Sequence, residues 1–139
     1  METMIPSTLS LGGAAEDVAT HLLLERGYFV LERNFRCKAG ELDVIAYRAD
    51  PRHRASRQYA LRRDAGLLCF IEVRSRNDDE HGDALLAIGR GKQAQVARVA
   101  ELYLSMRAPE YDEIRFDAIG ITGGVPTLVE DAWRPSGRF

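Results

Sequence analysis

Two acidic side chains stand inside segments that are otherwise apolar. Asp43 interrupts the run over 42–45, and Glu72 interrupts a longer run over 67–73. A buried carboxylate without a partner is costly, so each requires a cation or hydrogen-bond donors nearby. Because successive strand residues point to opposite faces, Asp43 is expected to share a face with Ile45, and Leu42 with Val44. If the two segments are neighbouring strands, the acids meet, and a hard cation such as Mg²⁺ or Mn²⁺ would relieve their repulsion.

Two further charged residues are placed where they could join this pair. Glu16 lies beside the apolar stripe of a helix predicted over 13–26, at an edge that can reach over a sheet, whereas Asp17 is expected on the wetter side. Arg74 follows Glu72 at a spacing of two, so the two side chains share a face of their strand. Such a group of charges suits either a metal site or a structural ion-pair network.

Lys92 and Asp117 are charged residues at positions where burial is expected. Lys92 begins a helical repeat with spacings of 4, 3 and 4, whose later members are Val96, Val99 and Tyr103. A lysine on that face requires a carboxylate, so it either reaches the acidic pair or forms a salt bridge at the sheet edge. Asp117 interrupts the apolar segment over 114–121, and its expected role is an ion pair or hydrogen bond that stabilises the sheet.

The elements that must position these residues follow from the apolar periodicity. They are a helix over 13–26, strands over 28–35, 42–47 and 67–73, a helix over 92–107, a strand over 114–121 and a further strand over 127–129. The apolar run over 67–73 is typical of a central strand covered on both faces. A hairpin followed by a helical crossover indicates an α/β fold, a mixed sheet of four to five strands flanked by helices in the order αβββαβ(β).

The composition indicates an ordinary globular chain. Its 139 residues are 45% hydrophobic and 29% charged, which predicts a flexible tail over 1–10 and a single domain over 11–139. Two cysteines are too few for a disulfide framework, so a reducing, cytoplasmic location is expected. No apolar stretch reaches membrane-spanning length, so no membrane association is expected.

The basic residues are unevenly distributed although the net charge is only -2. Most of them are arginines, and an Arg-rich loop without periodicity is predicted over 48–64. This loop is either a phosphate-binding element or a mobile flap. In the first case the nucleic-acid contacts are Arg52, Arg54 and Arg57, together with Arg76 after the third strand.

Several of these segments together resemble a known nuclease pattern. The residues that carry the resemblance are Glu16, Gly27-Tyr28, Arg33-Asn34-Phe35-Arg36, Gly40-Glu41-Leu42-Asp43-Val44-Ile45, Phe70-Ile71-Glu72-Val73-Arg74, Arg76, Lys92 and Arg115-Phe116-Asp117. In this order they resemble the PD-(D/E)xK pattern of restriction-endonuclease-like proteins and, more narrowly, the YraN-like bacterial family, over about 12–132. The resemblance implies a restriction-endonuclease-like core, as in archaeal Holliday-junction resolvases, and Mg²⁺-dependent cleavage of nucleic acid.

On this resemblance the acidic pair becomes a metal site. The implied metal ligands are Asp43, Glu72 and Glu16, and the implied catalytic residues add Arg74 and Lys92. The pattern has a lysine where this chain has Arg74, and arginine cannot act as a base because its pKa stays above about 12. Arg74 could still neutralise charge that develops on a phosphate.

Three functions remain open at this point. The first is a Mg²⁺-dependent nuclease that hydrolyses DNA phosphodiesters, including those of branched DNA, for which a homodimer would cut both strands. The second is a catalytically impaired nucleic-acid-binding protein of the same fold, which the arginine at position 74 favours. The third is a structural partner protein in which the carboxylates form only an ion-pair network.

Overall fold

The computed structural model describes residues 11–49, 66–76 and 88–136. The tail over 1–10 and nearly all of the Arg-rich loop, including Arg52, Arg54 and Arg57, lie outside the described residues. The described elements are α1 (Leu11–Glu25), β1 (Phe29–Cys37), β2 (Gly40–Arg48), β3 (Leu67–Arg76), α4 (Arg90–Arg107), β4 (Glu113–Thr122) and β5 (Val125–Trp133). The predicted order is confirmed, and the fifth strand, Val125–Trp133, is longer than the predicted 127–129.

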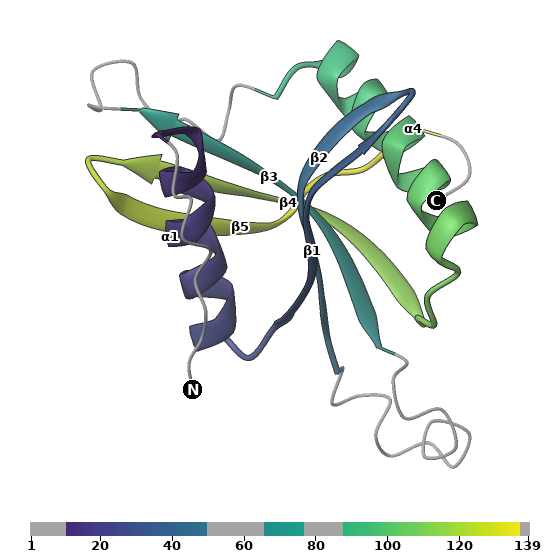
Figure 1. The fold of residues 1–139 in the computed structure, drawn as a ribbon, viewed down its shortest axis with the longest axis horizontal. Helices are drawn as coiled ribbons and strands as arrows, with labels where there is room; N and C mark the ends of the chain where they lie inside the picture. The colour runs from purple at the N-terminus through teal and green to yellow at the C-terminus, as the bar shows by residue number, and fades with distance from the viewer. Residues whose placement is uncertain (1–10, 50–65, 77–87, 137–139) are drawn as a thin grey trace.

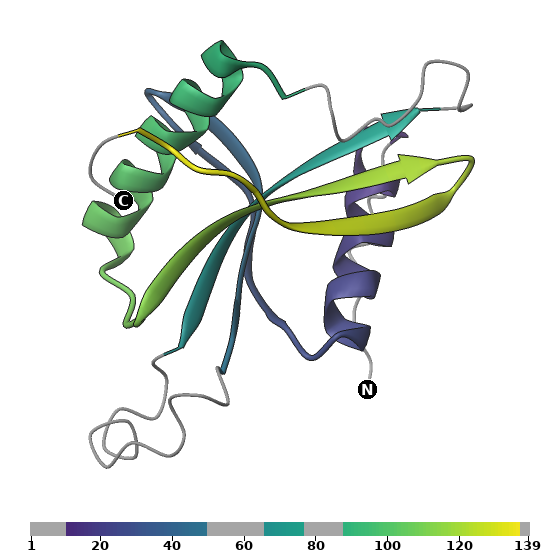
Figure 2. The same ribbon diagram turned by 180° about the vertical axis from the view of Figure 1, so that it is seen from behind.

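The strands form one five-stranded mixed sheet in the order β1-β2-β3-β4-β5. All neighbouring strands are antiparallel except β3 and β4, which are parallel and are connected through α4. Figures 1 and 2 show α1 and α4 on opposite sides of the strands. The predicted α/β class, with a mixed sheet flanked by helices, is therefore confirmed. Among the described residues no helix is both long and apolar enough to cross a membrane.

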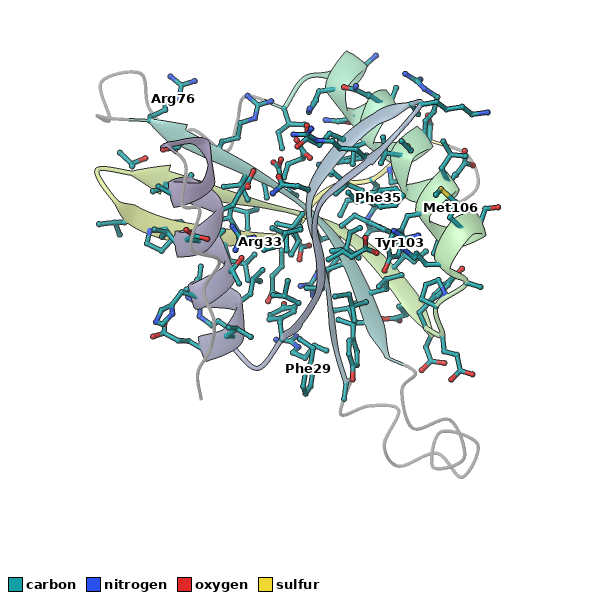
Figure 3. All side chains as sticks on the ribbon, viewed as in Figure 1. Phe29, Arg33, Phe35, Arg76, Tyr103 and Met106 are labelled. Carbon is teal, nitrogen blue, oxygen red and sulfur yellow. The ribbon has the colours of Figure 1, made fainter. Side chains whose placement is uncertain are left out.

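Each face of the sheet has its own apolar core. The core on the α1 side includes Ala19, Leu23, Val44, Cys69, Ile71 and Ile119. The core on the α4 side includes Leu42, Ile45, Phe70, Val96, Tyr103 and Phe116. Figure 3 shows Phe35 and Tyr103 close together, and their rings meet edge to face with centroids 5.1 Å apart. Residues 67–72 of β3 are all buried, as expected of a central strand.

Strand β2 departs from the predicted alternation at Asp43. Leu42 packs in the core on the α4 side, whereas Val44 packs in the core on the α1 side, so these two residues do not share a face. The β2–β3 ladder runs from Arg48 opposite Leu67 and stops at the pair of Val44 and Ile71. The expectation that Leu42 and Val44 share a face by simple alternation was therefore wrong, because β2 is irregular between them, where the facing strand β1 has Asn34 at φ 55°.

Beyond this point the sheet opens. The β3–β4 ladder continues to Arg76, whereas the end of the β1–β2 hairpin turns towards α4 (Figure 1). Gly40 at the hairpin turn has φ +139°, and a Cβ there would collide with the side-chain amide of Gln95 on α4. The Gln95 amide also donates a 3.5 Å hydrogen bond to the carbonyl of Ala39. The hairpin is thus held against α4, which brings Asp43 near the helix.

Candidate functional site

Asp43 lies where β2 separates from β3. Its Oδ2 accepts a 2.8 Å hydrogen bond from the backbone N–H of Val73, so the side chain replaces a ladder hydrogen bond that β2 no longer supplies. Burial raises the pKa of Asp43, while the Val73 N–H and the charge on Lys92 oppose the rise. The carboxylate is therefore positioned by backbone at an opening of the sheet.

Glu72 is the second carboxylate of this opening, and its side chain is only 5% exposed. It follows Ile71, the last residue of β3 that pairs with β2, which places it next to Asp43. Burial raises the pKa of Glu72 to about 7, and repulsion from Asp43 adds to the rise. Its Oε2 atom has no hydrogen-bond partner within the described chain. The acid is thus buried, repelled by its neighbour and only partly satisfied.

Lys92 brings a positive charge to the pair from the first turn of α4. Its Nζ lies 3.4 Å from Oε1 of Glu72, and the lysine side chain remains 37% exposed. The Lys92 ammonium opposes the rise in the pKa of Glu72. Of the two contacts that the helical spacing left open for Lys92, the structure therefore shows the one with the acidic pair. We call Asp43, Glu72 and Lys92 the acidic cluster.

Glu16 lies beside the acidic cluster and not within it. Burial raises the pKa of Glu16, a hydrogen bond with Asn34 opposes the rise, and the charge of Asp43 adds to it. Among the described residues no three His, Cys, Asp or Glu side chains gather closely enough to hold a metal ion. The structure thus brings together two of the three predicted ligands, because Glu16 is engaged by a β1 side chain.

Two contacts between α1 and β1 were not predicted from the sequence. Asn34 has φ 55°, which is uncommon for a residue other than glycine, and it holds Glu16. Asp17, expected on the wetter side, is instead half-buried and lies 2.7 Å from Nη2 of Arg33. Figure 3 shows Arg33 between α1 and the strands. The Arg33-Asn34 pair within the matching segment was the available indication of these contacts.

The predicted arginines occupy different places. Arg74 is half-buried on β3, and its charge opposes the rise in the pKa of Asp43. Arg76 lies at the end of β3 and points outward in Figure 3. Arg74 is therefore near enough to the acidic cluster for its charge to act on Asp43. Arg76 adds a second positive charge at the end of the same strand.

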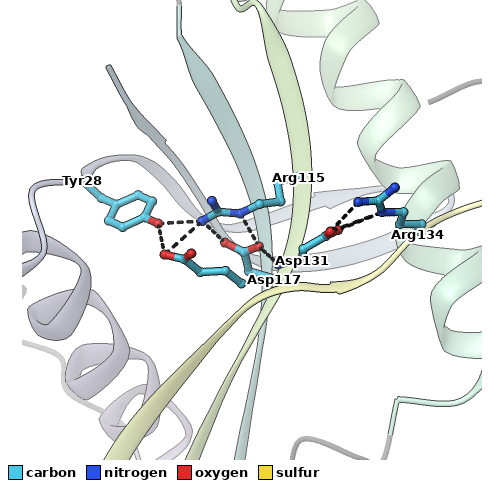
Figure 4. Close-up of polar contacts among 6 residues, drawn as sticks. Tyr28, Arg115, Asp117, Asp131 and Arg134 are labelled. Atoms are coloured by element: carbon cyan, nitrogen blue, oxygen red, sulfur yellow. Dashed lines mark hydrogen bonds and ion pairs between the residues drawn. The ribbon is translucent and has the colours of Figure 1, made fainter. Parts of the chain in front are cut away.

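A second buried acid, Asp117, has a complete set of partners (Figure 4). Both carboxylate oxygens accept 2.8 Å hydrogen bonds from Arg115, and Oδ1 also accepts the backbone N–H of Asp131 at 2.9 Å. Arg115 Nη2 donates to the hydroxyl of Tyr28 at 2.6 Å, and Glu130 approaches the same guanidinium. Asp131 has φ 55°, at an irregularity between β4 and β5. The ion pair and hydrogen bonds predicted for Asp117 are therefore confirmed.

The comparison with known proteins places this geometry in a family. Residues 15–121 match the uncharacterised protein family UPF0102. A UPF0102 protein of Pelobacter propionicus is 38% identical over 134 residues, which cover 96% of this chain and 81% of the relative. A UPF0102 protein of Dictyoglomus thermophilum is 35% identical over 111 residues, 80% of each chain. One from Ralstonia pickettii is 33% identical over 92% of this chain and 93% of the relative. With the motifs and the fold in agreement, the chain belongs to the UPF0102 family, the YraN-like family that its sequence resembles.

Proposed function

We propose that this protein is a Mg²⁺-dependent nuclease that hydrolyses DNA phosphodiesters, including those of branched DNA. The observation that supports the proposal is the acidic cluster, in which the buried Glu72, the half-buried Asp43 and Lys92 meet at the opening between β2 and β3. Because Glu72 is repelled by Asp43 and its buried Oε2 has no partner among the described residues, the cluster is better suited to receive a cation than to stand alone. Cutting both strands of a branch requires two active sites, so we include a homodimer.

The residues present fit a magnesium ion. Asp43 and Glu72 offer the oxygen ligands that Mg²⁺ prefers, and Glu16 is close enough to interact electrostatically with Asp43. A bound Mg²⁺ would activate water as a nucleophile and neutralise phosphate charge. Mn²⁺ offers the same chemistry to the same ligands.

The basic residues supply what the carboxylates lack. Lys92 holds its ammonium beside Glu72 and remains partly exposed, so it can orient water or approach a phosphate oxygen. A lysine ammonium is a compact charge that can hold and polarise a water, whereas the planar guanidinium of Arg74 is suited to phosphate oxygens. We therefore assign to Lys92 the chemistry of the motif's lysine, and to Arg74 the neutralisation of developing phosphate charge.

The experiment is a cleavage assay on linear and branched DNA with Mg²⁺ and with Mn²⁺. Glu72→Gln and Lys92→Met should each lower metal-dependent cleavage by about 10²-fold or more, since each removes a group of the acidic cluster. The matched controls are Glu110→Gln, at an exposed position, and Lys38→Met, which changes the chain's other lysine; both should cleave like the parent protein. Cleavage unchanged by Glu72→Gln, or no metal-dependent cleavage of any substrate, would overturn the proposal.

A second candidate function rests on Arg74. If the arginine has removed turnover, the protein binds DNA in a salt-dependent way without cutting it. Arg74→Lys should then create Mg²⁺-dependent cleavage, and adding Glu72→Gln should abolish it. A decrease in existing cleavage on Arg74→Lys favours the active nuclease instead, with Arg74 as a phosphate contact.

A further inference from the structure

A groove runs between α4 and the segment 133–136 that follows β5. Its volume is about 510 Å³, and the charged residues that line it are Arg90, Arg98, Arg134 and Glu101. Figures 1 and 2 show the last part of the chain crossing α4 on the side away from the β1–β2 hairpin. We call this hollow the arginine groove. None of the residues that line it belongs to the acidic cluster.

The helix presents a regular stripe to this groove. Arg90, Ala94 and Arg98 follow one another at spacings of four, and Ala97 lies beside them. With a rise of about 1.5 Å per residue, the two arginines are about 12 Å apart along α4. Small alanine side chains between two long basic ones leave room for a ligand to approach the helix. The stripe is therefore a basic-walled channel with a shallow floor.

The charges of the groove favour a polyanion. Arg90 and Arg98 are exposed, and neither makes an ion pair with any residue that the structure describes. Arg134 pairs with Asp131 at 2.7 Å at the surface, where such a pair is weak. A larger adjoining hollow of about 1110 Å³ shares Glu101 and Arg134 with the groove and is more acidic, since its other charged residues are Asp112, Glu113, Asp131 and Arg115. Of the two hollows, the arginine groove is therefore the one in which basic side chains outnumber acidic ones.

We propose that the arginine groove binds the sugar–phosphate backbone of a second, flanking stretch of the DNA substrate. This inference rests on the proposed function for the identity of the polyanion. Lys92 lies about 200° around α4 from Arg90, so the acidic cluster and the groove are on different sides of the helix. A straight strand cannot follow both sides, whereas two arms of a branched DNA can. The groove therefore favours a branched substrate over a simple linear one.

Binding is measured separately from cleavage, in the Glu72→Gln protein without divalent cations. Fluorescence anisotropy of a labelled four-way DNA junction is followed as the salt concentration increases. Arg90→Ala with Arg98→Ala should weaken junction binding at least about tenfold and reduce the slope of log affinity against log salt by about 1.8, because two phosphate contacts are lost. Trp133, the chain's one tryptophan, lines the groove, so its fluorescence should change on binding in the parent protein and less in the double variant.

The matched control is Arg26→Ala, an exposed arginine at the end of α1, compared with Arg98→Ala alone. Arg98→Ala should reduce the slope by about 0.9 and Arg26→Ala by almost nothing. Equal effects of the two variants, an unchanged slope in the double variant, or no junction binding at low salt would each overturn the groove. If the double variant binds as predicted but no variant cleaves, the groove stands and the nuclease fails. If cleavage is metal-dependent and the slope is unchanged, the nuclease stands and the groove fails.

Discussion

Two buried acids lie one residue apart on neighbouring strands and have opposite surroundings. In the β3–β4 ladder Asp117 is opposite Ile71, which packs on the α1 side, and Glu72 is opposite Ala118, which packs on the α4 side. Asp117 is fully buried, and Glu72 is 4% exposed. The two acids therefore differ in their partners and not in their depth.

The partners distinguish a structural acid from a candidate ligand. Asp117 accepts three hydrogen bonds, two from Arg115 and one from the backbone of Asp131. Arg115 in turn donates a hydrogen bond to the hydroxyl of Tyr28. Glu72 has a partly exposed lysine and a second carboxylate beside it, and its Oε2 has no hydrogen-bond partner in the described part of the chain. A satisfied acid stabilises the fold, whereas an unsatisfied one is maintained at a cost to the fold that a function would explain. The following predictions compare these two environments.

The largest effect is expected for Asp117→Asn. The substitution removes the buried anionic partner of Arg115 and leaves it, among the described residues, only the half-exposed Glu130 at 3.8 Å, which should lower the free energy of unfolding by about 3–5 kcal/mol. Denaturant unfolding followed by circular dichroism measures this loss. A loss below about 1 kcal/mol would show that the network around Asp117 does not stabilise the fold as its geometry indicates.

In contrast to Asp117→Asn, Glu72→Gln should raise the free energy of unfolding above neutral pH. Because the folded protein raises the pKa of Glu72 from 4.5 to about 7, this acid favours folding fully below pH 4.5 and progressively less as the pH rises to 7. The variant should therefore be more stable than the parent at pH 8, by on the order of 3 kcal/mol. Unfolding from pH 4 to 8 should show a flatter profile for the variant, and equal profiles would contradict the raised pKa.

Tyr28→Phe tests whether the satisfied network tolerates the loss of a neutral member. The hydroxyl accepts one hydrogen bond from Arg115, which keeps both bonds to Asp117, and donates a long one of 3.4 Å to Glu130. The free energy of unfolding should fall by about 1–1.5 kcal/mol. If the loss equals that of Asp117→Asn, the hydroxyl and not the carboxylate is the centre of the network.

Lys92→Met should have the smallest effect on stability and a clear effect on titration. Removing a partly exposed ammonium should cost about 0.5–1 kcal/mol at pH 8. The pKa of Glu72 should move further upward, because the attraction that opposes its rise is lost. Carboxyl chemical shifts followed by NMR against pH measure this, and an unchanged titration would show that Lys92 does not act on Glu72.

Much of the fold and part of the site could be predicted from the sequence. Apolar periodicity identified both described helices and all five strands, because burial of one face imposes that period. β5 exceeded its prediction, since an edge strand needs few apolar residues and pairs through its backbone. Asn34 as the partner of Glu16, and the end of regular alternation at Asp43, depend on how α1 and α4 pack on the sheet, which no local pattern contains.

By itself the sequence determined which carboxylates had to be buried. Asp43, Glu72 and Asp117 each interrupt an apolar strand, and an acid in such a place must find partners whatever the final topology.

The tertiary structure decided which of these acids has hydrogen-bond donors for both of its oxygens. The donors for Asp117 come from β4 itself and from the irregular part of β5, and Arg115 also donates a hydrogen bond to Tyr28. At Glu72 the β2–β3 ladder has already ended. Of the residues that the structure describes, Lys92 and the backbone of Asp43 reach this acid, and none of them is a partner for its Oε2. Partners separated by dozens of residues are chosen by packing, and for this reason the position of the candidate site was visible in the sequence while its incomplete satisfaction was not.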